Sequence, residues 1–342
     1  MPTPATSGTI AWNPAITQMI TAMYRKIGAL AEDETPSAGM FNDALFAGNA
    51  LIKEWMALGI HVWTEEEAIL FFQAGQNRYL LGGANAQGVQ GPYGPDNCCD
   101  ANSWVPMQIA NPASAGDTAV TVTNVVAPNG VAVASGDHFG VVLDSGVAFW
   151  TTVNGAPAGN VVTLAAPIPA GQSASAQNNA FDYATKIVRP LMVPRARQIY
   201  YQGGQNGPRL TPMTVMSRKE YMDLPQPLDP GISTQFFYTP QLVSGEFYAW
   251  PNPQNANFGA RLTWYRPLMD LTTPSNTADL PQEWLNGLMW NLAMEMAPEF
   301  DCPPQRWEMI QAMAATKLIL IQSYDRESEP IEFGMGFDQA QR

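Results

Sequence analysis

The sequence predicts an α+β protein in which helices from both ends of the chain form one bundle, with antiparallel β-modules inserted between them. Two patterns carry this prediction. Apolar residues recur every three or four positions in the first sixty residues and again after residue 280, as in helices that face a core. Between about residues 110 and 270 they alternate with polar residues in short β-branched runs, which is typical of a small barrel or sandwich.

We therefore expect five consecutive segments. These are a first part of the bundle with its following loop (1–105), an inserted β-barrel or sandwich module (106–183), a second β-rich region (184–277), a second part of the bundle (278–325) and an extended C-terminal tail (326–342). The tail is acidic and aperiodic but carries scattered apolar residues, so we expect it to become ordered on binding a partner.

Three helices are predicted near the N-terminus. The first opens at Asn13-Pro14, and the second runs from about Ser37 to Leu58. The third begins at Thr64 with an apparent capping box, in which the Thr64 hydroxyl and the Glu67 carboxylate satisfy free amides of the first turn. It would continue to Gly82, and a loop rich in Gly, Asn and Pro would follow as far as Pro106.

The β-regions contain regularly spaced runs bounded by turn residues. Expected strands of the insert lie near 118–125, 139–143, 147–153 and 161–164, and those of the second region near 198–201, 235–238, 246–250 and 261–265. Two further helices, 281–297 and 304–324, complete the bundle, and the first of them ends before Pro298 as the restriction on the residue preceding proline predicts.

The helix at 281–297 has apolar residues on two sides. Its main stripe faces a core and consists of Leu285, Leu288, Met289, Leu292 and Met296. Trp290 and Met294 project from nearly the opposite side, which one monomer core does not explain. Together with Trp284 they are candidates for subunit or partner contacts, because Trp and Met are enriched where subunits meet.

Charge is scarce and acidic overall. Charged residues are 14% of the 342-residue chain and the formal net charge is −13, which argues against a sequence-independent grip on nucleic acid. One block nevertheless holds cations and no acid. It contains Lys186, Arg189, Arg195, Arg197, Arg209, Arg218 and Lys219. This block is either a solvated face with intersubunit partners or a band that meets DNA or an acidic partner.

No catalytic, cofactor or metal site is predicted. The only histidines are His61 and His138, and three cysteines without framework spacing indicate a reducing compartment. Asp144 in an Asp-Ser-Gly turn resembles half of an aspartic protease dyad, and the acids at 65–67 could serve a glycan hydrolase, but a turn and a helix start explain both. Neither a signal peptide nor a membrane span is expected, so the chain should be made in a cytoplasm.

Several motifs, taken in order, resemble one protein family. They are Lys53-Glu-Trp55 within 44–59, Ser217-Arg-Lys-Glu-Tyr-Met-Asp-Leu-Pro225, Glu246-Phe-Tyr-Ala-Trp-Pro-Asn-Pro253, Leu262-Thr-Trp-Tyr-Arg-Pro-Leu-Met-Asp270, Leu280-Pro-Gln-Glu-Trp-Leu-Asn-Gly-Leu288 and Asn291-Leu-Ala-Met-Glu-Met-Ala-Pro298. This ordered set resembles the head-to-tail adaptors of short-tailed bacteriophages, also called packaged-DNA stabilisation proteins or tail accessory factors. The module at 106–183 looks like an elaboration that shorter members lack.

The resemblance implies a non-enzymatic virion protein at the head–tail interface, assembled in the bacterial cytoplasm. It implies a twelve-fold ring that binds the portal protein, extends the DNA channel and presents a platform to the tail nozzle, with tail fibre proteins as further partners. A negative wall would let packaged double-stranded DNA slide without sticking. The C-terminal segment, with Ile331, Phe333 and Phe337, would reach the portal. The alternatives are a virion-associated hydrolase and a glycan-binding tail component.

Overall fold

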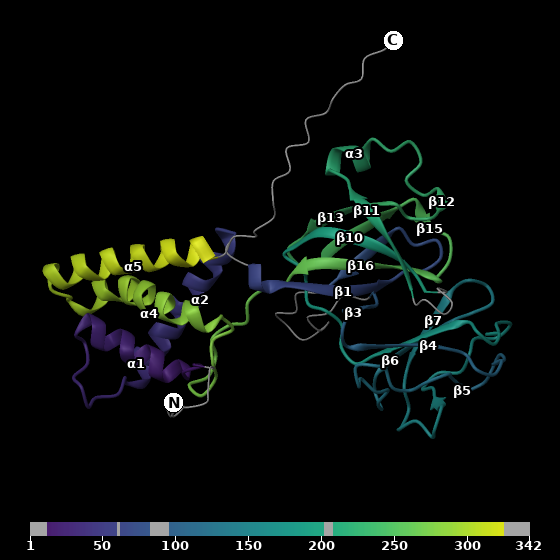
Figure 1. The fold of residues 1–342 in the computed structure, drawn as a ribbon, viewed down its shortest axis with the longest axis horizontal. Helices are drawn as coiled ribbons and strands as arrows, with labels where there is room; N and C mark the ends of the chain where they lie inside the picture. The colour runs from purple at the N-terminus through teal and green to yellow at the C-terminus, as the bar shows by residue number, and fades with distance from the viewer. Residues whose placement is uncertain (1–11, 60–61, 83–95, 202–207, 325–342) are drawn as a thin grey trace, which may run out of the picture. The chain divides into compact units, whose positions relative to one another are not determined.

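A computed structural model describes the chain except for residues 1–11, 60–61, 83–95, 202–207 and 325–342 (Figure 1). It confirms the mixed α+β class, with helices from the N- and C-terminal parts of the chain and several β-sheets between them. The chain divides into a helical unit, Met1–Trp63 with Leu268–Arg342, and a β-unit, Thr64–Pro267.

The helical unit is a bundle that both ends of the sequence build. Its helices are α1 (Ile16–Ile27), α2 (Ala38–Ala57), α4 (Gln282–Met296) and α5 (Pro304–Tyr324), with a short 3₁₀ turn (Ala297–Phe300) between the last two. These confirm four predicted helices. Local signals set their ends, because the Ser37 hydroxyl accepts a hydrogen bond from the Met40 amide at the start of α2. Gly28 ends α1 in the left-handed region.

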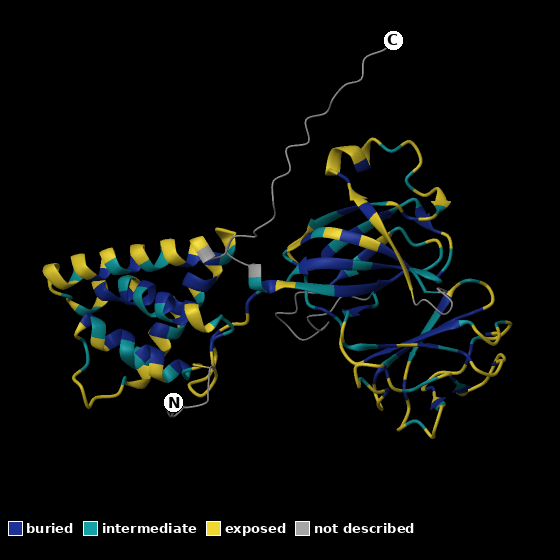
Figure 2. Cartoon of the chain, viewed as in Figure 1, coloured by how far each residue is buried: buried dark blue, intermediate teal, exposed yellow. Residues whose placement is uncertain are grey.

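Helix α4 is the centre of this bundle. It packs against α1, α2 and α5, so that most of its circumference is covered (Figure 2). The indoles of Trp55 and Trp284 are both buried and meet edge to face, with ring centroids 6.0 Å apart. One hydrophobic core therefore joins segments that are more than two hundred residues apart in the sequence.

The β-unit is organised by an eight-stranded sheet. Its strands are β1 (Glu65–Phe71), β2 (Arg78–Leu81), β3 (Cys98–Asp100), β10 (Met192–Tyr200), β11 (Arg209–Val215), β13 (Gln235–Pro240), β14 (Gly245–Trp250) and β16 (Phe258–Tyr265). Their order is β2-β14-β13-β11-β10-β16-β1-β3, and all pairs are antiparallel except β11 with β13. The sheet curls into a nearly closed barrel whose inner face encloses its own core.

The predicted third helix is wrong, because residues 65–71 and 78–81 form β1 and β2. Strand β1 pairs with β16 along its whole length and with β3 on its other side. Its apolar run, Ala68–Phe71, is buried on both faces, and a short continuous apolar run cannot be assigned to helix or strand by periodicity alone. Thr64 is buried next to the strand, and the carboxylate of Glu67 pairs with arginines on β16 and β10 instead of capping a helix.

The expected loop between Gly82 and Pro106 is also partly wrong. Cys98 and Cys99 lie in β3 at the edge of the large sheet and are buried, and a further strand, β4 (Trp104–Gln108), begins the insert. Burial raises the pKa of both thiols, as expected for inert structural cysteines.

The insert is a small β-module with a core of its own. A four-stranded sheet has the order β4-β9-β6-β7, and β5 pairs with β8. The remaining strands are β5 (Ala119–Thr121), β6 (His138–Val142), β7 (Ala148–Thr152), β8 (Val161–Thr163) and β9 (Asn179–Tyr183). Phe71 of β1 stacks among Trp104, Trp150, Phe181 and Tyr183, and this aromatic cluster fastens the insert to the outer face of the large sheet.

The described part of the β-unit also contains a short helix and a two-stranded sheet. Helix α3 (Arg218–Met222) was not predicted, although Ser217 and Glu220 form a capping box at its start. Strands β12 (Pro230–Gly231) and β15 (Asn252–Pro253) pair with each other.

Candidate functional site

The interface candidates on α4 lie at different depths in the bundle. Trp284 is buried in the core, where its ring also meets that of Trp63 at 4.2 Å between centroids. Trp290 and Met294 are half-buried and pack against the rim of the same core. We expected no contact within one chain to account for the side of α4 that carries Trp290 and Met294. That expectation is wrong, because both pack against the core and the Lys26 ammonium of α1 lies 4.1 Å from the centroid of the Trp290 ring.

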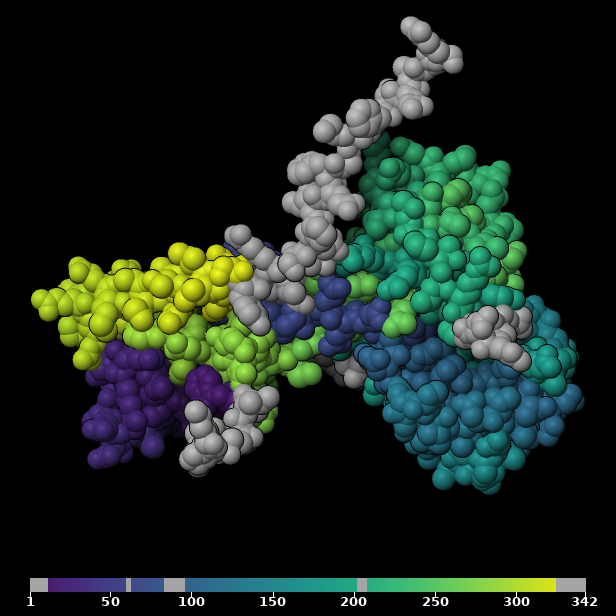
Figure 3. Space-filling model, viewed as in Figure 1, coloured from purple at the N-terminus to yellow at the C-terminus, as the bar shows by residue number. Residues whose placement is uncertain are grey.

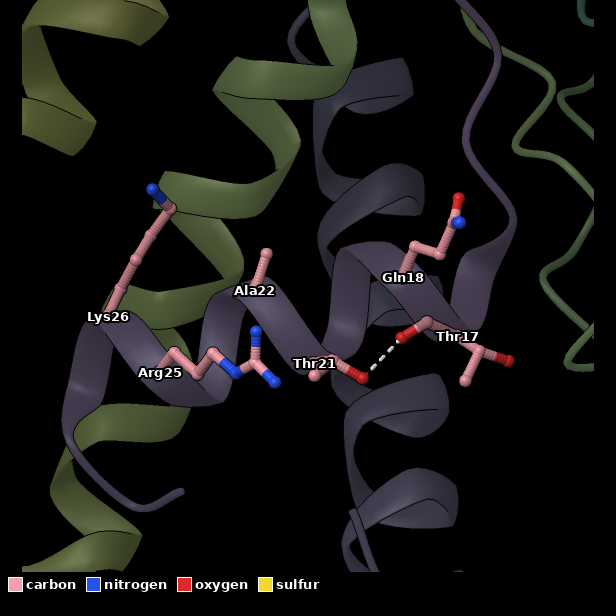
Figure 4. Close-up of a pocket in the computed structure, with 6 residues that line it drawn as sticks. All are labelled: Thr17, Gln18, Thr21, Ala22, Arg25 and Lys26. Carbon is pink, nitrogen blue, oxygen red and sulfur yellow. Dashed lines mark hydrogen bonds between the residues drawn. The ribbon is translucent and has the colours of Figure 1, made fainter. Parts of the chain in front are cut away.

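An open hollow of about 530 Å³ lies along α1 beside this contact. Figure 4 shows Arg25 and Lys26 at one end of it and Thr17 and Gln18 at the other, with small side chains between them. Thr21 donates its hydroxyl hydrogen to the Thr17 carbonyl at 2.7 Å, so one polar group of the floor is already satisfied by the helix. The hollow is a basic surface rather than an enclosed ligand site.

Sequence reasoning missed the large apolar side chains that the bundle exposes. Phe46 on α2 is 80% exposed, and Met309, Ile319 and Leu320 on α5 are 51%, 66% and 54% exposed. Figure 3 shows α5 running along the surface of the helical unit. The low charge of this segment in the sequence indicates such a face, because Lys317 is the only charged residue between Glu308 and Tyr324. A solvent-facing helix normally carries more charge.

The structure brings together only part of the predicted basic block. Arg195 and Arg197 are exposed on one face of β10. Lys186 is half-buried, and burial lowers the pKa of its ammonium. Arg189 donates to the Gln241 carbonyl at 2.7 Å, and Arg209 is exposed on β11.

A glutamate of β1 forms ion pairs with arginines on the outer face of the large sheet. Glu67 accepts a hydrogen bond from Arg197 at 3.2 Å and another from Arg261, which stands opposite Arg197 on β16. Glu66 points to the other face of β1 and pairs with Arg266, just after the end of β16, at 2.7 Å. Sequence reasoning assigned these acids to a helix start and overlooked Arg261. Cross-strand register, which local sequence does not fix, makes this face a set of ion pairs and leaves no uniform positive band.

The protease-like turn has a structural role. Asp144 lies in the turn between β6 and β7, where it accepts hydrogen bonds from the Ser173 hydroxyl at 2.7 Å, the Ser175 amide at 2.9 Å and the Asn178 side chain at 2.8 Å. The Ser173 bond is the largest of several that lower its carboxyl pKa to about 2. A dyad aspartate would instead share a proton with a second carboxylate.

A different acid of the insert has an unusual environment. Asp182 on β9 is 1% exposed, and neither of its carboxylate oxygens makes a regular hydrogen bond within the described chain. Burial, with a smaller effect of the Asp137 carboxyl, raises its pKa to about 8. Asp182 lies on the same face of β9 as Ala180, which belongs to the insert core, so its burial bears on the stability of the module.

Other predicted features lie outside the described residues. These are the tail residues Ile331, Phe333 and Phe337, together with His61 and most of the Gly-rich segment after Gly82. Among the described residues no cluster of His, Cys, Asp and Glu could hold a metal ion. No helix in that part of the chain is both long and apolar enough to span a membrane.

The described helices expose large apolar side chains that suit contacts with other chains. The SU10 adaptor protein family matches residues 143–332, more than half of the chain. The chain therefore belongs to the SU10 adaptor family and is a phage virion adaptor protein. This confirms the family that the ordered motifs indicated, and it points to a structural rather than an enzymatic role. No curated protein matches the chain significantly.

Proposed function

We propose that copies of this chain form a ring at the junction of head and tail in the virion. The ring binds the portal protein, extends the DNA channel, helps to retain the packaged DNA and presents a platform to the tail nozzle. Twelve copies are expected from the resemblance to the adaptors of short-tailed phages. Assembly takes place in the cytoplasm of the bacterial host, and tail fibre proteins are further candidate partners.

The observation that carries this proposal is the family membership, which covers the second half of the large sheet as well as α4 and α5. Two further features support it. The bundle exposes large apolar side chains on α2 and α5, as expected of a chain that buries surface against neighbours. The acidic tail carries apolar side chains, among them Ile331, Phe333 and Phe337, which suit docking on the portal.

Mass photometry of the purified chain, alone and mixed with portal rings, tests the proposal. Twelve copies of the 37.2 kDa chain should add about 450 kDa to the portal particle. A chain that remains monomeric and leaves the portal mass unchanged would contradict the proposed function. Removal of residues 326–342 should weaken portal binding more than ring formation, because the tail is proposed to contact the portal.

We further propose that the ion pairs on the outer face of the large sheet keep the ring from binding DNA tightly, because they neutralise its arginines. In Glu67→Gln, Arg197 and Arg261 lose their shared carboxylate, so the variant should bind a short DNA duplex several-fold more tightly than the wild type at low salt. The gain should disappear as salt rises. Fluorescence anisotropy of a labelled duplex measures the DNA affinity and its dependence on salt.

Glu308→Gln is the matched control, because it changes the net charge equally at an exposed position of α5 without an ion pair in the described chain. Equal DNA affinity in the two variants would refute the role of the Glu67 pairs. It would leave the ring proposal intact, since particle mass is measured independently.

A further inference from the structure

The helical unit has one protruding aromatic side chain and one hollow of matching size on different helices. Phe46 of α2 is 80% exposed, although α2 belongs to the bundle and its other large apolar side chains are buried or half-buried. The hollow lies between α4 and α5. Its lining is Glu283, Trp284, Asn286, Gly287, Lys317, Leu320 and Ile321.

We propose that Phe46 of one copy inserts into the hollow between α4 and α5 of the next copy. This inference rests on the proposed ring and names the surfaces that join its subunits. A ring with one kind of subunit is built from heterologous contacts, in which two different patches of the same chain meet. Phe46 and the hollow are two such patches on one unit.

The dimensions of the hollow fit an aromatic ring. Its volume is about 180 Å³, and an apolar cavity of about 150 Å³ accepts a benzene molecule. The floor is apolar, because Trp284 and Ile321 are buried beneath it. Gly287 contributes no side chain, and a Cβ there would lie 2.1 Å from the Cδ1 atom of Ile321. The two helices therefore approach closely below the opening.

Each patch has a charged side chain whose sign is opposite to that of one beside the other patch, although the lining of the hollow also contains the acidic Glu283. Asp43 precedes Phe46 by one helical turn and is exposed, and Lys317 precedes Leu320 by one turn at the edge of the hollow. Within the described chain neither Asp43 nor Lys317 forms an ion pair. A neighbouring copy supplies a partner for each of them at once, which favours a second copy over an unrelated protein as the occupant.

The remaining exposed face of α5 extends the same surface. Ile319 and Leu320 are exposed beside the hollow, and Met309 lies further along the helix. An aromatic anchor in a pocket surrounded by a wider apolar rim is the usual arrangement of an interface hot spot.

A complementation experiment tests the inference by mass photometry, in the presence of portal rings if assembly requires them. Phe46→Asp removes the inserted ring and Leu320→Asp blocks the hollow, so each variant alone should remain monomeric. A mixture of the two should form dimers and nothing larger, because it contains one intact pair of patches, with Phe46 from one variant and the hollow from the other. Both positions are more than half exposed, so helical circular dichroism should match the wild type.

Leu242→Asp is the matched control, since Leu242 is 89% exposed on the β-unit and should tolerate the charge without loss of rings. Asp43→Lys should raise the half-assembly concentration roughly tenfold, and adding Lys317→Asp should restore it.

Rings formed by Phe46→Asp, or a mixture that stays monomeric, would overturn the inference while leaving the proposed ring standing. Suppose that deletion of residues 325–342 abolishes the rings and that Phe46→Asp does not. The tail would then be the occupant of the hollow in place of Phe46. A wild-type chain that never forms rings, with or without portal, would overturn both proposals.

Discussion

The buried carboxyl of Asp182 should make the protein less stable as the pH rises through neutrality. Its pKa in the folded chain is raised to about 8, chiefly by burial, whereas an unfolded Asp titrates near 4. The folded state thus binds a proton that the unfolded state releases between these values. The contribution of Asp182 to stability is therefore greatest below about pH 4, falls as the pH rises towards 8 and is constant above it.

The size of the effect follows from the distance between the two pKa values. Each unit corresponds to about 1.4 kcal/mol, so the three units between pH 4 and pH 7 correspond to ~4 kcal/mol as an upper limit. Asp182→Asn keeps the shape of the side chain and removes the ionisable group. We therefore expect the variant to be more stable than the wild type at pH 7 and above, by about 2–4 kcal/mol.

Urea unfolding from pH 5 to 9, followed by tryptophan fluorescence, measures this difference. Asp144→Asn is the control in the same module, because a carboxyl with a pKa of about 2 is ionised in both folded and unfolded chains over this range. It should lower stability by a similar amount at every pH, because the charge and the hydrogen bonds that it alters are present throughout this range. Parallel stability curves for Asp182→Asn and the wild type would refute the reasoning.

Two further predictions concern packing. Gly82→Ala should cost more than 3 kcal/mol in urea unfolding, because φ is +61° and the new Cβ would lie 1.9 Å from the Arg189 amide nitrogen. Gly75→Ala, with φ +79° and open space around it, should cost about 1 kcal/mol, and equal costs would argue against the close approach. Trp284→Ala should destabilise the bundle by about 3–5 kcal/mol. Trp290→Ala should cost less than half as much, and the reverse order in thermal melts followed by circular dichroism would contradict their placement.

The sequence determined the four bundle helices because their signals are local. Ser37 caps α2, Gly28 ends α1, and Pro298 follows the end of α4, so the chain within a few residues specifies each boundary. Apolar spacing then selected the buried face of each helix. The ordered motifs likewise indicated the adaptor family without reference to the fold, and residues 143–332 confirm it.

Local sequence patterns could not predict the secondary structure of segments that are buried by partners distant in the sequence. Residues 65–71 have acids followed by an apolar run, which suits a capped helix as well as a strand. Pairing with β16, about two hundred positions away in the sequence, and with β3, about thirty positions away, makes these residues a strand. The same pairing turns Glu67 from a supposed cap into the partner of Arg197 and Arg261.

Tertiary structure alone decided which apolar side chains stay at the surface. Trp284 and Trp290 look equivalent in the sequence, yet the first is buried between helices and the second is covered in part by Lys26. Phe46 lies on a helix whose other large apolar side chains are buried or half-buried, and only the arrangement of α1, α2, α4 and α5 leaves it exposed. Periodicity tells which residues can face a core, whereas burial depends on what the other helices cover.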